Sequence, residues 1–138
     1  MADNTISYVT LISALALLLF LIHFFDDMKR GEIESQFGSF SVGLITYGIV
    51  WVTWLLSLFL MHLDRLKVGL GLVLVMSALT AFPTLMMHVL GIGKYSFVEI
   101  MESSGLIFAI IASLLSLISF VVFVLSIIAL INVMREGG

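Results

Sequence analysis

The sequence predicts an all-α integral membrane protein, an up-down bundle of four transmembrane helices, and two observations carry that prediction. Hydrophobic residues make up 62% of the 138-residue chain and charged residues only 11%, whereas soluble domains contain roughly 25% charged residues. Four apolar segments reach the length of roughly 20 residues that a helix needs to cross a bilayer. Because these segments are apolar on nearly every face and do not alternate with polar residues, they favour helices over barrel strands.

The four predicted helices cover residues 6–25, 42–61, 68–90 and 106–133, and we expect a single transmembrane domain over residues 1–138. The first segment runs directly into acidic residues and lacks a small-residue cleavage site. It is therefore expected to be a retained helix and not a cleaved signal peptide.

Two local signals refine the last two helices. Pro83 lies inside the third segment, where it removes a backbone hydrogen bond and predicts a kink. Ahead of the fourth segment, Ser96 and Glu99 have the spacing of a capping box, in which each side chain binds the other residue's backbone N–H. This pattern predicts a short interfacial helix that begins near Phe97 and bends at Gly105.

The orientation in the membrane is poorly determined by charge. Basic residues divide evenly between the two sides, so the positive-inside rule gives a tie. The acidic residues concentrate in the first and third connections, residues 26–41 and 91–104, and we call that side the acidic face. We expect both termini on the opposite, cytoplasmic side. The basic residues are Arg65, Lys67 and Arg135 on the side of the termini, against Lys29, Arg30 and Lys94 on the acidic face.

Small residues recur along the fourth helix in alternating steps of four and three. Such a seam lets helix backbones approach closely, which is how membrane helices associate without a hydrophobic drive between them. We therefore expect this seam to face the other helices. Its first members are Gly105, Ala109, Ala112, Ser116 and Ser119.

The second helix instead carries an aromatic stripe, formed by Tyr47, Trp51 and Trp54. The two tryptophans fall near the middle of the helix and not at the interface belt where tryptophan is usually enriched. The stripe therefore predicts core packing or contact with a partner, in preference to a cofactor site.

Candidate ligands gather near the acidic face. His23 and His88 occupy the ends of the first and third helices, Asp27 lies one turn after His23, and Glu99 belongs to the interfacial segment. Two imidazoles with carboxylates suit a single transition metal ion, and paired imidazoles could also bind haem b. The simpler expectation is no cofactor, with these side chains meeting lipid headgroups or pairing with neighbouring bases such as Arg30.

The function that the sequence favours is that of a small non-catalytic accessory or structural subunit of a larger membrane complex, whose partners are the bilayer and other membrane subunits. The lack of cysteine excludes disulfides and thiolate-bound metals, and no basic tract indicates nucleic acid. No catalytic triad or phosphate-binding loop supports an enzyme. Two alternatives remain: a metal- or haem-binding membrane protein that uses His23 and His88, and an oligomeric channel or carrier, although embedded charges usually mark such paths.

Overall fold

The computed structural model describes residues 2–63, 65–92 and 95–136, and the regular elements in those ranges are all helices. Four of its helical segments are long and apolar enough to cross a membrane, which is consistent with a multi-pass integral membrane protein. Lys94, one of the residues in the count of basic charges, lies outside the described residues. The four long helices are α1 (Ala2–Arg30), α3 (Phe40–His62), α4 (Leu66–Thr84) and α6 (Leu106–Glu136).

Three short elements connect the long helices. The π-helical turn η1 (Leu85–Val89) continues α4, and α5 (Phe97–Ser104) precedes α6, so a helix does begin at Phe97 as the capping box predicts. The third, α2 (Glu32–Phe37), lies where we expected only a connection. Gly31 and Gly38 bracket it with φ of 73° and 72°, left-handed conformations that glycine adopts without steric cost.

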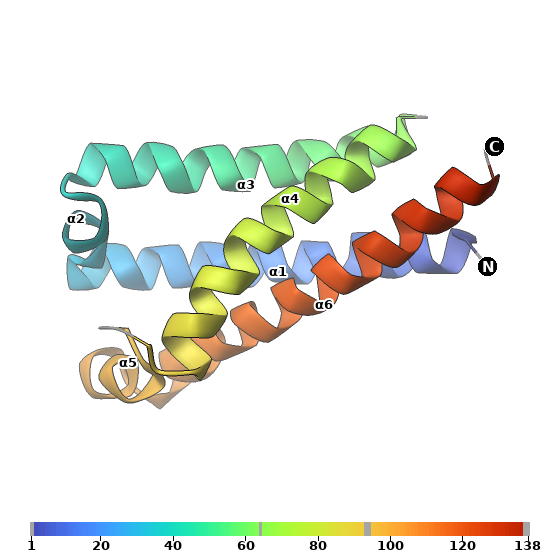
Figure 1. The fold of residues 1–138 in the computed structure, drawn as a ribbon. Coiled ribbons are helices and arrows are strands. Elements are labelled where there is room, and N and C mark those ends of the chain that lie inside the picture. Colours follow the sequence, from blue (N-terminus) through green and yellow to red (C-terminus); the bar gives the residue numbers. More distant parts are fainter. Residues whose placement is uncertain (1, 64, 93–94, 137–138) are drawn as a thin grey trace.

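Successive long helices run in alternating directions, and α2 and α5 lie at the end of the molecule opposite both termini (Figure 1). That end carries the residues of the acidic face. Helix α6 packs extensively against α4 and α1, and α3 packs against α4, but α1 and α3 contact each other much less. The close helix contacts therefore run in series, from α1 to α6 to α4 to α3, and all four long helices contribute residues to one buried core.

Most of the buried residues of α6 have small side chains, and Leu115 and Val122 are the larger ones among them. Because serine and alanine are short, the helix backbones can approach closely and gain van der Waals contacts along their length. The hydroxyls of Ser116 and Ser126 donate to carbonyls of their own helix, at 3.0 Å and 2.7 Å. Buried members of this core on α6 are Ala109, Ala112, Ser116, Ser119, Ser126 and Ala129.

Regular α-helical geometry ends shortly after Pro83. A proline lacks the N–H that would continue the backbone ladder, and the Thr84 hydroxyl donates to the Thr80 carbonyl at 2.6 Å in this turn. The backbone then widens into η1, closed by the Leu90 N–H donating to the Leu85 carbonyl at 3.0 Å. Such π turns occur frequently at functional sites, and this one carries His88.

Candidate functional site

A buried group of ionisable side chains lies at the acidic-face end, and we call it the polar network. Charged side chains at the ends of membrane helices usually face headgroups, so their burial at this place calls for specific partners. His23, Asp26, Asp27 and His88 are only 2–5% exposed. The members of the network are His23, Asp26, Asp27 and Arg30 on α1, Tyr47 on α3, and His88 on η1.

Arg30 is the centre of the network. Its Nε donates to Asp26 Oδ2 at 3.0 Å, and its NH2 nitrogen donates to Asp27 Oδ1 at 2.7 Å. A third nitrogen reaches Glu32 Oε1 at 3.3 Å across the α1–α2 junction. The neighbouring Lys29 is exposed, so of these two adjacent basic residues it is Arg30 that pairs with the buried aspartates. The spacing of three and four residues along one helix face explains this choice.

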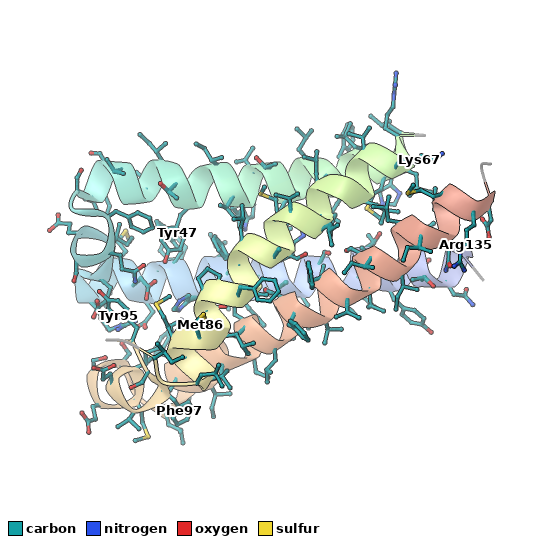
Figure 2. All side chains as sticks on the ribbon, viewed as in Figure 1. Tyr47, Lys67, Met86, Tyr95, Phe97 and Arg135 are labelled. Carbon is teal, nitrogen blue, oxygen red and sulfur yellow. The ribbon has the colours of Figure 1, made fainter. Side chains whose placement is uncertain are left out.

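Tyr47 connects α3 to the network. Its hydroxyl donates to Asp27 Oδ2 at 2.8 Å, and its ring packs against Phe20 and Phe24 of α1, with ring centroids 5.3 Å and 5.2 Å away. Figure 2 shows Tyr47 in the space between α1 and α3 near the acidic-face end. A member of the expected aromatic stripe thus contributes a polar contact at this end, whereas Trp54 is fully buried in the core.

The two histidines from different helices meet inside the network. The ring centroids of His23 and His88 are 5.0 Å apart, and the ring planes are at 85°. His23 Nε2 also lies 3.5 Å from Asp27 Oδ2. His23, His88 and Asp27, named from the sequence as possible ligands, are therefore brought together.

The hydrogen bond of His88 fixes which ring nitrogen carries its proton. His88 Nδ1 lies 2.6 Å from the backbone carbonyl of Tyr95, and a carbonyl only accepts, so Nδ1 carries the hydrogen of the neutral ring. Nε2 then bears a free lone pair. This atom is buried and has no hydrogen-bond partner among the described residues. Tyr95 in turn donates from its hydroxyl to Ser35 Oγ at 3.0 Å, which ties η1 to α2.

Glu99, the fourth ligand named from the sequence, is used elsewhere. It is exposed, and its Oε2 accepts hydrogen bonds from the backbone N–H and hydroxyl of Ser96 at 2.8 Å and 3.0 Å. The capping box expected from the spacing of these two residues is present. Within the described ranges no group of three or more His, Asp or Glu side chains is arranged to hold a metal ion. The metal prediction therefore depends on the histidine pair alone.

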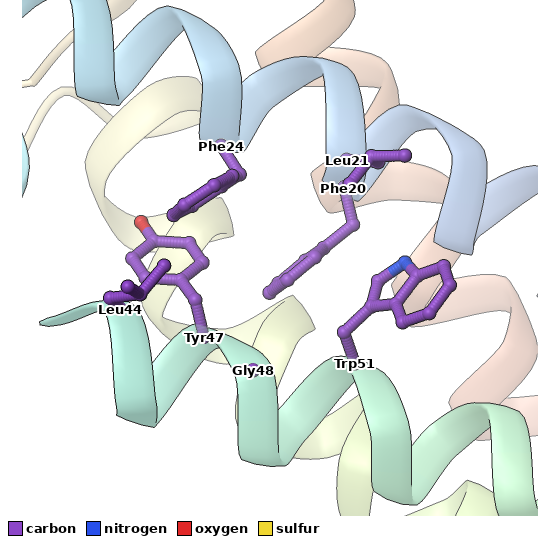
Figure 3. Close-up of a pocket in the computed structure, with 7 residues that line it drawn as sticks. All are labelled: Phe20, Leu21, Phe24, Leu44, Tyr47, Gly48 and Trp51. Atoms are coloured by element: carbon purple, nitrogen blue, oxygen red, sulfur yellow. The ribbon is translucent and has the colours of Figure 1, made fainter.

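Two cavities adjoin the network, and Phe20 and Tyr47 line both of them. The smaller cavity, about 130 Å³, lies between α1 and α3 and is almost wholly apolar (Figure 3). The larger, about 190 Å³, is bordered by α1, α2, α3 and α4 and includes His23, Gln36 and Thr84. Both occur where α3 stands away from α1.

Sequence reasoning missed two residues that matter at this site. Tyr95 was not singled out, because its role depends on a backbone carbonyl that sequence patterns do not reveal. Gln36 was not singled out either, since α2 was not expected. For Arg30 the signal was present in the sequence, because it follows Asp26 and Asp27 at helical spacing.

In the described residues the fold is a small helical one, with four helices long and apolar enough to cross a membrane and with a buried polar network and adjacent cavities at one end. Comparison of the chain with known protein families, with curated proteins and with solved structures finds no match. Proposals for its function therefore rest on the geometry of the chain itself.

Proposed function

We propose that the four long helices form an up-down bundle in the bilayer, with α5 at the interface of the acidic face, and that the protein is a non-catalytic accessory subunit of a larger membrane complex. The observation that carries this proposal is the smaller cavity between α1 and α3, which we call the notch. It lies between two of the candidate membrane-spanning helices, and its lining includes exposed residues such as Gly48.

The shape of the notch supports a protein partner. Rigid rings form its walls, with Phe20 and Phe24 projecting from α1 and Tyr47 and Trp51 from α3, as Figure 3 shows. Gly48 lines the notch on α3, and a Cβ placed there would meet no atom within 4 Å.

Membrane helices associate mainly through packing, because lipid tails are as apolar as the side chains. An apolar hole of this kind fits a branched side chain from a partner helix, in the manner of a knob in a hole. The occupant we propose is a leucine, isoleucine or valine on a transmembrane helix of another polypeptide.

The test is a substitution that fills the notch with a side chain of this protein itself. Gly48→Leu should abolish recovery of a stoichiometric membrane companion when the tagged protein is purified in mild detergent and its partners are quantified by mass spectrometry. Gly71→Leu is the matched control, because Gly71 on α4 also has no atom within 4 Å of an added Cβ and does not line the notch. Equal recovery from both variants would count against the proposal. So would a wild-type protein that carries only lipid in the notch and no companion.

A second candidate, binding of one transition metal ion by His23 and His88, is favoured by the free lone pair on His88 Nε2. Metal-binding histidines usually donate their other ring N–H to a carbonyl or carboxylate, as His88 does to Tyr95. Two imidazoles that share a tetrahedral ion have ring centroids about 5 Å apart, since each centroid lies about 3 Å from the metal. The observed separation is 5.0 Å.

Metal analysis and an absorption spectrum of the purified protein test this second candidate, and the same spectrum tests the wider alternative of haem b. We expect one zinc or copper ion per chain in the wild type and none in His88→Ala. His62→Ala is the control, because His62 ends α3 at the opposite end of the molecule. Metal content that is low in all three proteins, or equal in all three, would eliminate the candidate.

A further inference from the structure

The larger cavity has the size and lining of a site for a small ring compound. Its volume is about 190 Å³, and an engineered apolar cavity of about 150 Å³ is known to bind benzene. Phe20, Phe37 and Tyr47 provide aromatic surface, and the ring centroids of Phe37 and Tyr47 lie 5.8 Å apart at 72°. A mostly apolar pocket with a few converging polar groups is the usual form of a small-molecule site.

The position of the cavity indicates delivery from the bilayer. Thr46 on α3 and Leu79 on α4 line it and are both exposed, so the cavity opens between two membrane-spanning helices. A molecule dissolved in the lipid reaches this opening without passing through water. The occupant is therefore expected to be lipid-soluble.

The polar groups of the lining mainly accept hydrogen bonds. The hydroxyl hydrogens of Thr46, Thr80 and Thr84 are already donated to carbonyls of their own helices, at 2.8 Å, 3.0 Å and 2.6 Å. Their oxygens keep lone pairs that can accept. The Tyr47 hydrogen is likewise donated to Asp27. A ligand that donates a hydrogen bond fits this lining better than one that only accepts.

Besides these hydroxyls the lining includes His23 and Gln36, and Gln36 is an exposed residue of α2. The side-chain amide of Gln36 makes no hydrogen bond to any other described residue, and Gln36 lines the cavity from α2. An amide both donates and accepts, so it can hold a hydroxyl group from either direction.

From these observations we propose that the larger cavity binds a lipid-soluble aromatic molecule carrying a hydroxyl group, of the phenol or quinol class. The ring packs among Phe20, Phe37 and Tyr47, and the hydroxyl donates to an oxygen of the lining. This site shares Phe20 and Tyr47 with the notch, but it does not depend on a protein partner.

The experiment compares para-fluorophenol with para-fluorotoluene, which have nearly the same shape and differ by a hydroxyl in place of a methyl group. Fluorine NMR of each compound is recorded with the purified protein in detergent micelles. We expect saturable one-to-one binding, with the phenol bound about five-fold more tightly, the gain typical of one added hydrogen bond.

Two variants of α3 separate cavity binding from partition into the micelle. Val50→Phe fills the cavity, which Val50 lines, and should abolish saturable binding. Val52→Phe places the same side chain two residues away, where Val52 is 58% exposed and does not line the cavity, and should leave binding unchanged. Circular dichroism and gel filtration establish that both variants fold.

Three outcomes would overturn the proposal. Equal, non-saturable uptake of both compounds by all three proteins would mean that no site exists. Equal affinity for the phenol and the toluene would refute recognition of the hydroxyl. A phospholipid that copurifies and is not displaced by the phenol, detected by native mass spectrometry, would assign the cavity to lipid.

Discussion

Helix α3 is held in different ways at its two ends. Toward His62 it crosses α4 in direct backbone contact, because Gly69 has no side chain: a Cβ there would lie 2.7 Å from the Ser57 carbonyl oxygen. Toward the acidic face, α3 is joined to α1 by the hydrogen bonds of Tyr47 and Trp51, with a cavity on each side of Tyr47.

The difference between the two ends of α3 indicates where this small protein has room for a binding site. At the end near His62, which we call the packed end, small residues leave little space between the helices. Buried hydroxyls such as that of Ser57 donate to carbonyls of their own helix there. At the acidic-face end, which we call the open end, hydrogen bonds join different helices, and the helices stand apart around the two cavities. Binding functions are therefore expected at the acidic-face end, and stability should depend on contacts at both ends for separate reasons.

Loss of the Arg30 side chain should be the most damaging single change at the open end. Arg30→Ala leaves Asp26 and Asp27 buried without their cation, which we expect to lower the free energy of unfolding by about 3–5 kcal/mol. The measurement is reversible unfolding in mixed micelles of dodecyl maltoside and dodecyl sulfate. Lys29→Ala is the control, since Lys29 is exposed, and should change stability by less than about 0.5 kcal/mol. Similar losses in both variants would refute the central role of Arg30.

At the packed end, Gly69→Ala should cost about 1–3 kcal/mol, the usual range for overfilling a close contact. The added Cβ would press on the Met61 backbone nitrogen at 2.9 Å, so α4 must move away from α3. Gly71→Ala meets no atom within 4 Å and should be neutral or slightly stabilising, because alanine favours helices. The two variants are compared by the same unfolding assay. If Gly71→Ala were the more harmful, the close crossing at Gly69 would not be what fixes this end.

Tyr47→Phe removes one hydrogen bond to Asp27 and keeps the aromatic ring. We expect a loss of about 1.5–3 kcal/mol, the range for hydrogen bonds to charged groups. Tyr8→Phe serves as the control, because Tyr8 is 57% exposed on α1. A loss no larger than that of Tyr8→Phe would show that ring packing alone joins α3 to α1 here.

The sequence predicted the number and approximate positions of the long helices, because apolar length is a strong local signal. It also predicted the start of α5 at Phe97, since a capping box is read directly from spacing. It did not predict α2, which has only six residues between two left-handed glycines. The meeting of His23 and His88 was raised as a possibility and left open, because it depends on how η1 and α1 pack, and that depends on contacts distant in sequence.

The smallest expected effect concerns Trp51, the second polar link between α3 and α1. Its Nε1 donates to the Leu17 carbonyl at 3.1 Å, and in an α-helix that carbonyl already accepts a backbone hydrogen bond from its own helix. Trp51→Phe therefore removes an additional bond and leaves no buried acceptor unpaired, so we expect a loss of only about 0.5–1.5 kcal/mol.

The informative measurement is a double-mutant cycle with Tyr47→Phe. Tyr47 and Trp51 lie one turn apart on the same face of α3, and Phe20 packs beside both in the notch wall (Figure 3). If the hydrogen bonds of Tyr47 and Trp51 act cooperatively, the double variant should lose about 0.5 kcal/mol less free energy of unfolding than the sum of the two single losses. The reason is that the first substitution already weakens the contact that the second removes. Strict additivity would mean that the two links hold α3 independently, and that the open end is a pair of separate contacts and not one cooperative unit.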